Sequence, residues 1–201
     1  MRSWSGSAAT GLLAALLLAF AGTASAAAQN VTRTRFGFGY VAQAPELMAG
    51  GAAYVIFPVA GGIGLYADAK FDASNPTRKS NYLADLTAQQ VEDQFGDRFL
   101  YSTASWRSFD LAVMRPLRPS LTIYAGAGYA RKREYKEYLD DTGTRGLAGH
   151  YWVEDTAARA STVNLMGGFF FRMSRFLNAQ FGVESAPGGV TVGLSLALPP
   201  Q

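Results

Sequence analysis

The sequence predicts an all-β fold: an eight-stranded antiparallel up-and-down transmembrane β-barrel preceded by a signal peptide. Three observations carry this prediction. The N-terminus is typical of an exported chain, apolar and polar residues alternate through most of the remainder, and short connections alternate with longer ones. We expect a signal peptide at residues 1–26 and one barrel domain at residues 27–201.

The N-terminal segment has the three parts of a signal peptide. Arg2 supplies a positive charge, residues 11–20 form a short apolar core, and Ala24-Ser25-Ala26 offers small residues for cleavage. Cleavage as late as residue 28 also fits the pattern. The apolar core is too short for a membrane-spanning helix, and no later run is long enough, so a closed barrel is the spanning structure left to this chain.

Alternation with a period of two predicts the strands. In the last of them, Val190, Val192, Leu194, Leu196 and Leu198 share one face, and Thr191, Gly193, Ser195 and Ala197 share the other. The same pattern predicts strands at residues 33–40, 49–57, 63–71, 108–113, 121–129, 162–171, 177–184 and 190–198.

The connections fall into two classes. Short turns are expected at residues 58–62, 115–119 and 173–175, and the other connectors are residues 43–46, 72–103, 131–160 and 185–188. Such a layout is typical of outer-membrane barrels, whose short turns face the periplasm and whose long loops face outward. Within the longer loops, Thr87-Ala88-Gln89-Gln90 predicts a capped short helix reaching Phe95, and residues 131–138 alternate as an extension of their hairpin.

The polarity of the two faces decides between a membrane barrel and a soluble one. The less apolar face carries mainly Gly, Ser, Thr, Ala and Asn with few charges, which would solvate an outer surface poorly. The apolar face should therefore meet lipid. Aromatic residues expected on that face are Phe36, Phe57, Phe71, Phe109, Tyr129, Phe169 and Phe171. The alternative is a soluble periplasmic β-barrel that binds a small apolar ligand.

Glycine–aromatic strand segments add a family resemblance. With its leader, its eight alternating strands and segments such as Phe36-Gly37-Phe38-Gly39-Tyr40 and Ala125-Gly126-Ala127-Gly128-Tyr129, the chain resembles small outer-membrane barrels of the OmpA, OmpX and opacity-protein kind. The resemblance is one of pattern and spans nearly all of residues 27–201. One departure is the ending Leu198-Pro199-Pro200-Gln201, where such barrels often carry an aromatic residue.

Charged residues on the polar face are the candidate site. They are Arg33, Arg35, Asp68, Lys70, Asp110 and Glu184. Because eight strands enclose a space that side chains fill, we expect these residues to form a salt-bridged interior plug, with a narrow gated ion path as the sharper alternative.

No catalytic, cofactor or metal site is predicted. The chain has no cysteine and one histidine, His150. A lipid-modifying barrel enzyme that uses His150, with Glu154 and Asp155 nearby, is a further alternative.

The charge of the chain limits its partners. A net charge of +3 is too small to suggest nucleic acid. The sequence instead predicts a non-enzymatic, structural or surface-interaction protein of the outer membrane. Its expected partners are membrane lipid, including lipopolysaccharide, and a surface or host protein that meets loops 72–103 and 131–160. Arg115, Arg118, Arg172 and Arg175 lie in or beside the short turns and predict a basic rim near lipid head groups.

Overall fold

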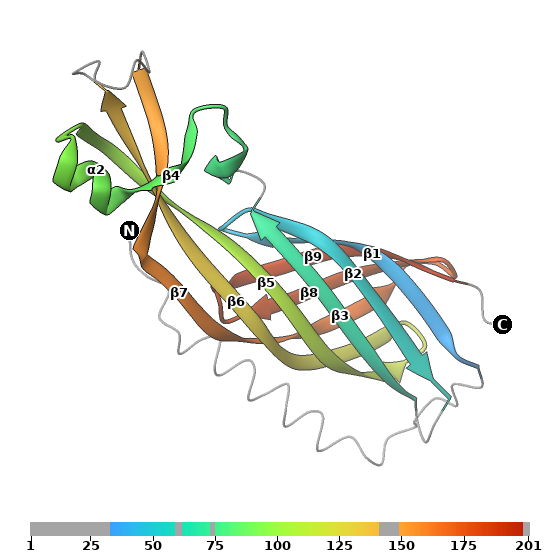
Figure 1. The fold of residues 1–201 in the computed structure, drawn as a ribbon. Coiled ribbons are helices and arrows are strands. Elements are labelled where there is room, and N and C mark those ends of the chain that lie inside the picture. The colour runs from blue at the N-terminus through green and yellow to red at the C-terminus, as the bar shows by residue number, and fades with distance from the viewer. Residues whose placement is uncertain (1–32, 59–61, 73–74, 141–148, 199–201) are drawn as a thin grey trace. The chain divides into compact units, whose positions relative to one another are not determined.

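The computed structural model describes residues 33–58, 62–72, 75–140 and 149–198 (Figure 1). The predicted signal peptide and residues 59–61 of the predicted turn at 58–62 lie outside these ranges. The chain divides into two compact units. Among the described residues, one unit, the barrel unit, contains those within 33–71, 108–130 and 162–198, and the second unit contains those within 72–107 and 131–161.

Eight strands of the described chain close into a ring in the order β1-β2-β3-β5-β6-β7-β8-β9. Antiparallel pairing of β1 with β9, and of β7 with β8, completes the closure. This ring confirms the predicted eight-stranded barrel. The strands are β1 (Arg35–Ala44), β2 (Met48–Phe57), β3 (Ile63–Asp72), β5 (Arg98–Arg118), β6 (Leu121–Asp140), β7 (Gly149–Arg172), β8 (Leu177–Glu184) and β9 (Gly189–Ala197).

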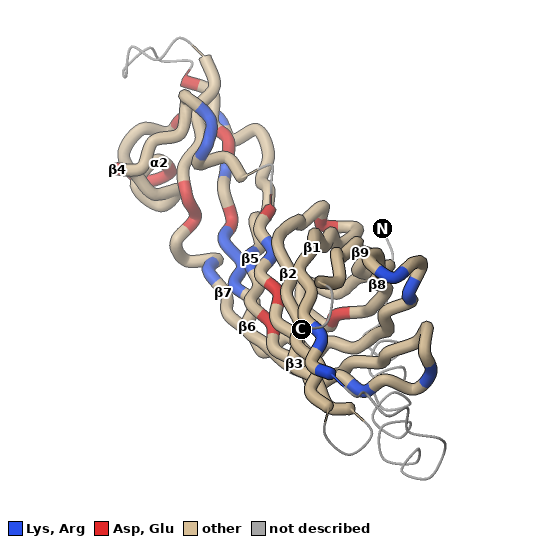
Figure 2. Tube along the Cα trace, turned by 90° about the vertical axis from the view of Figure 1, so that its right-hand side faces the viewer, with Lys and Arg blue, Asp and Glu red and all other residues tan. Residues whose placement is uncertain are grey.

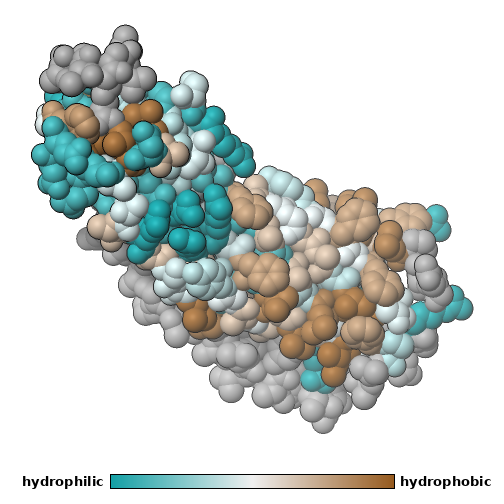
Figure 3. Space-filling view, viewed as in Figure 1, coloured by the Kyte–Doolittle hydropathy of each residue, from teal (hydrophilic) through white to brown (hydrophobic). Residues whose placement is uncertain are grey.

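The side chains alternate between the two sides of the ring as the period of two predicts. On β1, Phe36 and Phe38 are exposed, whereas Gly37 and Val41 are buried. On β9, Leu194 is exposed and Thr191 is buried. All seven aromatic residues expected on the apolar face are among the exposed large hydrophobic residues. Figure 3 shows brown, hydrophobic residues over the barrel unit.

The two long connectors differ from prediction because much of each is strand. Residues 98–103 belong to β5, residues 131–140 to β6, and residues 149–160 to β7. The extension predicted at residues 131–138 is confirmed, whereas residues 98–103 and 149–160 are predicted to be loops because no apolar row runs the length of either segment. One turn also differs: β5 continues through Pro116 to Arg118, and the turn to β6 is Pro119-Ser120.

The second unit has its own small core. A ninth strand, β4 (Tyr82–Thr87), pairs in parallel with β7, and the helix α2 (Ala88–Gln94) follows it. The predicted capping box is present: the Thr87 hydroxyl accepts from the Gln90 backbone N–H, and the Gln90 side chain accepts from the Thr87 N–H. The buried residues of this core are Ala88, Val91, Tyr138, Tyr151 and Val153. A short 3₁₀ helix, η1 (Pro76–Arg78), precedes β4.

No helix in the described part of the chain is long and apolar enough to cross a membrane.

Candidate functional site

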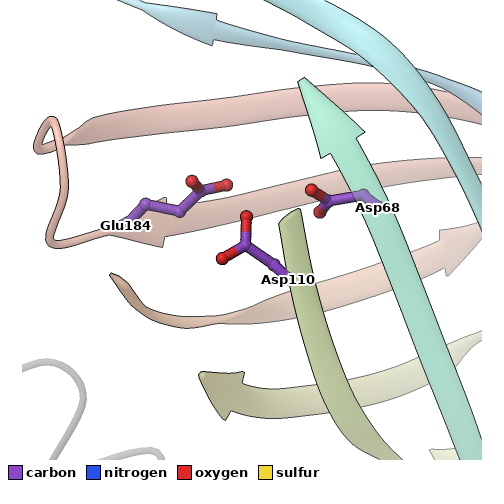
Figure 4. A group of neighbouring side chains, drawn as sticks. All are labelled: Asp68, Asp110 and Glu184. Carbon is purple, nitrogen blue, oxygen red and sulfur yellow. The ribbon is translucent and has the colours of Figure 1, made fainter. Parts of the chain in front are cut away.

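Four charged residues meet inside the barrel unit. Lys70 and Asp68 lie on β3, Asp110 on β5 and Glu184 on β8, and their side chains have no solvent exposure. The Lys70 Nζ contacts an Asp68 oxygen and lies 3.0 Å from Asp110 Oδ2 and 2.9 Å from Glu184 Oε1. Figure 4 shows the three carboxylates pointing toward one another inside the ring. We call these four residues the ion cluster.

Neutral side chains hold the carboxylates in place. The Asn164 amide donates to Asp110 Oδ1 and to Glu184 Oε2, both at 2.8 Å. Its own oxygen accepts from the Ala186 backbone N–H at 2.9 Å, which fixes the amide orientation. The Tyr66 hydroxyl donates to Asp68 at 2.7 Å. Each acid is thus fixed by Lys70 and by one neutral donor, as buried charges require.

The ion cluster carries three carboxylates against one ammonium, so three ionised acids would leave it with a formal charge of −2. The carboxylate oxygens of Asp68, Asp110 and Glu184 lie within 4.8 Å of one another, a spacing that could hold a metal ion. Lys70 Nζ contacts all three groups and serves as the cation between them. A metal ion in the same position would have to replace Lys70.

An aromatic layer fills more of the barrel interior. Tyr54, Tyr66, Tyr124 and Phe170 have ring centroids 5.1–5.6 Å from their neighbours. Gln180 donates to the hydroxyls of Tyr66 at 2.7 Å and Tyr124 at 3.1 Å. Through Tyr66, a continuous set of hydrogen bonds joins this layer to the ion cluster. Side chains therefore occupy the interior, as expected for a barrel of this size.

Two of the six predicted interior residues lie outside the ion cluster. Arg33 precedes β1 and is exposed, and Arg35, the first residue of β1, is half-buried. The strand register explains the separation. Arg35 pairs with Ile56 near the end of β2, beside the beginning of β3, whereas Asp68 and Lys70 lie toward the end of β3.

Asn164 and Gln180 lie in the predicted strands 162–171 and 177–184, but no pattern in the sequence assigns them to the site. The alternation of apolar and polar residues predicts that both side chains point into the barrel, but no local pattern indicates that Asn164 bridges acids on two other strands. That contact depends on which residues of β5, β7 and β8 lie at one level of the ring.

The second unit has separate polar networks. Glu92 on α2 accepts from Lys136 Nζ at 2.9 Å and from the Tyr138 hydroxyl at 2.7 Å. These hydrogen bonds, the one from Tyr138 first, lower the pKa of the Glu92 carboxyl. Lys136 also lies 3.1 Å from Asp155. Such contacts tie α2 to β6 and β7 within this unit.

His150 lies on the surface of the second unit. Its side chain is 57% exposed, and its Nδ1 is 3.8 Å from Glu137 Oε1. Among the described residues, no serine or threonine hydroxyl is recorded in a hydrogen bond with the imidazole. The neighbouring Glu154 binds Arg159, with 2.7 Å between Oε1 and Nε. The arrangement does not form a nucleophile–base pair around His150.

Comparison with known proteins gives matches in structure only. A scan of protein-family models found no matching family, and a search of curated proteins found no matching sequence. Among solved structures, the chain is similar to Ail, the attachment invasion locus protein of Yersinia pestis, with 7% identity and a TM-score of 0.43 over 83% of this chain and 98% of that one.

Two further structures share this likeness. The N-terminal β-barrel domain of Pseudomonas aeruginosa OprF matches at 10% identity and a TM-score of 0.42, over 83% of this chain and 98% of that one. A de novo designed transmembrane β-barrel matches at 11% identity and a TM-score of 0.41, over 82% and 95%. These values assign neither a role nor a ligand.

Proposed function

We propose that this chain is an exported, non-enzymatic β-barrel of the outer membrane whose barrel unit spans the bilayer. The observation that carries the proposal is the polarity of the ring. Large apolar side chains are exposed on its outside, including Phe38, Leu111 and Leu194 at 52–55%, while its inside holds the ion cluster at zero side-chain exposure.

This polarity opposes the soluble alternative. A soluble barrel buries its apolar face and presents its polar face to water, and exposed apolar patches on soluble monomers rarely exceed a few hundred Å². Here the outward rows of several strands are apolar. In a bilayer the same rows contact hydrocarbon, and closure of the ring satisfies the backbone hydrogen bonds that lipid cannot satisfy.

We assign the surface role to the second unit. Its surface includes hydrophilic residues, seen as teal in Figure 3, and its ion pairs join α2 to β6 and β6 to β7. Such a surface suits an aqueous environment. Within this proposal, residues 72–107 and 131–161 face outward and provide contacts with lipopolysaccharide or with a surface or host protein, while the ion cluster acts as an interior plug.

The first experiment tests membrane integration. Membranes from cells that make the protein are washed with urea, and the pellet is run on SDS gels with and without boiling. An integral barrel stays in the pellet and changes mobility on boiling, because the closed ring resists SDS until heated. Release of the protein into the soluble fraction would rule out the membrane assignment.

A second experiment tests orientation, and the absence of cysteine from the chain makes it simple. Gln94→Cys places a thiol at the exposed end of α2, and Met173→Cys places one in the turn between β7 and β8, where Met173 is 58% exposed. A membrane-impermeant maleimide should label the Gln94→Cys variant in intact cells and the Met173→Cys variant only after permeabilisation. The opposite result would invert the proposed orientation.

A further inference from the structure

A pocket lies at the end of the barrel unit where β1 begins and where the turns β5–β6 and β7–β8 lie. Its volume is about 220 Å³. Its walls include Arg35, Arg172 and Arg175 from β1, β7 and the β7–β8 turn, together with Tyr54, Ser120 and Asn178. Figure 2 shows Lys and Arg in blue at turns of the barrel unit.

The charge of this pocket is unbalanced. No aspartate or glutamate is among the described residues that line it. Within the described chain, no salt bridge is recorded for Arg35, Arg172 or Arg175, whereas Lys70 contacts three acids. The Arg175 guanidinium instead lies 4.4 Å from the centre of the Phe176 ring. Three cations facing one small space repel one another unless an anion lies between them.

Neutral donors complete the lining. Tyr54 is only 9% exposed, and its hydroxyl accepts from the Asn178 amide at 2.7 Å. That bond leaves the tyrosine proton to donate, and no acceptor for it is recorded among the described residues. Tyr54 and Phe170, which line the pocket, also belong to the aromatic layer.

We propose that this pocket binds a phosphate group, and we call it the mouth site. Guanidinium groups present a planar set of donors that matches phosphate oxygens, and donors from three segments suit a group with several oxygens better than a planar carboxylate. The volume holds several water molecules and therefore accommodates a phosphate. Free phosphate and a phospholipid head group share this chemistry. Binding of a phospholipid head group rests on the proposed membrane location, whereas binding of free phosphate does not.

Calorimetry on the full chain folded in non-ionic detergent tests the mouth site. The probes are inorganic phosphate, dihexanoylphosphatidic acid below its micelle concentration, and acetate. We expect saturable binding of at least one phosphate compound, weakened by added salt, and an affinity loss on the order of tenfold or more in the R35Q/R172Q variant, since two charged donors are removed. R33Q/R118Q is the matched control, because it removes the same charge from exposed residues outside the lining.

The outcomes separate the possible ligands. Phosphatidic acid binding without inorganic phosphate binding assigns a lipid head group, and equal affinities assign free phosphate. The proposal is overturned if neither phosphate compound binds the wild type, if acetate binds as tightly, or if R35Q/R172Q binds like the control.

If R35Q/R172Q does not fold, the boiling-dependent gel shift will be lost, and a second variant then tests the proposal. R175Q changes an exposed turn residue and should weaken binding several-fold. Unchanged affinity in R175Q would then overturn the proposal. The assay uses detergent, so a negative result leaves the membrane-fractionation result intact.

Discussion

At the scale of single residues, Lys70 is the cation on which three buried acids depend. Leaving a buried charge without a partner costs far more free energy than the intact ion pair contributes, because the lost hydration is not replaced. Replacing Lys70 leaves Asp68, Asp110 and Glu184 facing one another with only neutral donors, so this side chain should matter more to stability than any exposed lysine.

Lys70→Met should therefore lower the free energy of unfolding by about 3–5 kcal/mol, measured by urea titration of the protein folded in lipid vesicles. The matched control is Lys132→Met. Lys132 pairs with Glu134 at 3.0 Å, but the two side chains are 30% and 24% exposed, so its loss should cost about 1 kcal/mol or less. Equal effects of the two substitutions would show that the ion cluster does not stabilise the barrel.

Glycine 37 makes room for the aromatic layer. Gly37 pairs directly with Tyr54 across β1 and β2, and a Cβ at this position would collide with the tyrosine ring. Gly37→Val should displace Tyr54, break its hydrogen bond with Asn178, and lower the free energy of unfolding by about 1–3 kcal/mol in the same urea titration. At Gly51, on β2, an added Cβ meets nothing within 4 Å, so Gly51→Val should be close to neutral. Similar losses at both positions would contradict this packing argument.

Apart from Arg33, which is exposed, the sequence indicates which charges face inward, but it does not indicate which of them meet. Asp68, Lys70, Asp110 and Glu184 follow from alternation, and the structure brings all four together. Arg35 has the same inward direction and lies at another level of the ring, because its place depends on pairing with Ile56. The register of strand pairing brings together residues far apart in the chain, and no local sequence pattern reveals it.

At the scale of the elements, β5 runs from the second unit into the barrel unit, where its outward row is apolar. Leu111 is 55% exposed in the barrel unit, and Ser102, on the same strand, is exposed in the second unit. If the proposed function is correct, lipid surrounds the first side chain and water the second. The same substitution should then have different effects at the two positions.

Leu111→Arg should destabilise the barrel folded in vesicles by about 2–4 kcal/mol, because a charge then faces hydrocarbon. Ser102→Arg should change stability by about 0.5 kcal/mol or less. Both values come from urea titration followed by the boiling-dependent gel shift. A neutral Leu111→Arg would favour the soluble barrel, whose exposed positions accept arginine.

Local signals explain which elements were predictable. Thr87 and Gln90 predict the start of α2 because the capping box is formed by residues three apart. Strands of the barrel unit were predictable from their apolar rows. The extension of β6 through residues 131–138 was predictable from its alternation, whereas the strand segments at 98–103 and 149–160 were not, because their apolar rows are short and their pairing depends on neighbouring strands.

At the scale of the whole molecule, ring closure and a filled interior together oppose a continuous water path. The ion cluster and the aromatic layer are joined by Tyr66, which contacts Asp68 and Gln180. Both layers lie inside one ring of strands, so an ion crossing the barrel unit must pass the two of them. Opening a path requires separating Lys70 from its acids or displacing buried rings.

Planar bilayers containing the wild-type protein should therefore show no steady ionic conductance. A variant with Asp68, Lys70, Asp110 and Glu184 all replaced by alanine removes the ion cluster without leaving an unpaired buried charge, and the aromatic layer should still block the path. Adding Tyr66→Ala and Tyr124→Ala removes side chains from that layer and should produce measurable conductance. Equal currents through the two variants would show that the ion cluster alone closes the barrel. Steady current through the wild type would contradict the interior plug.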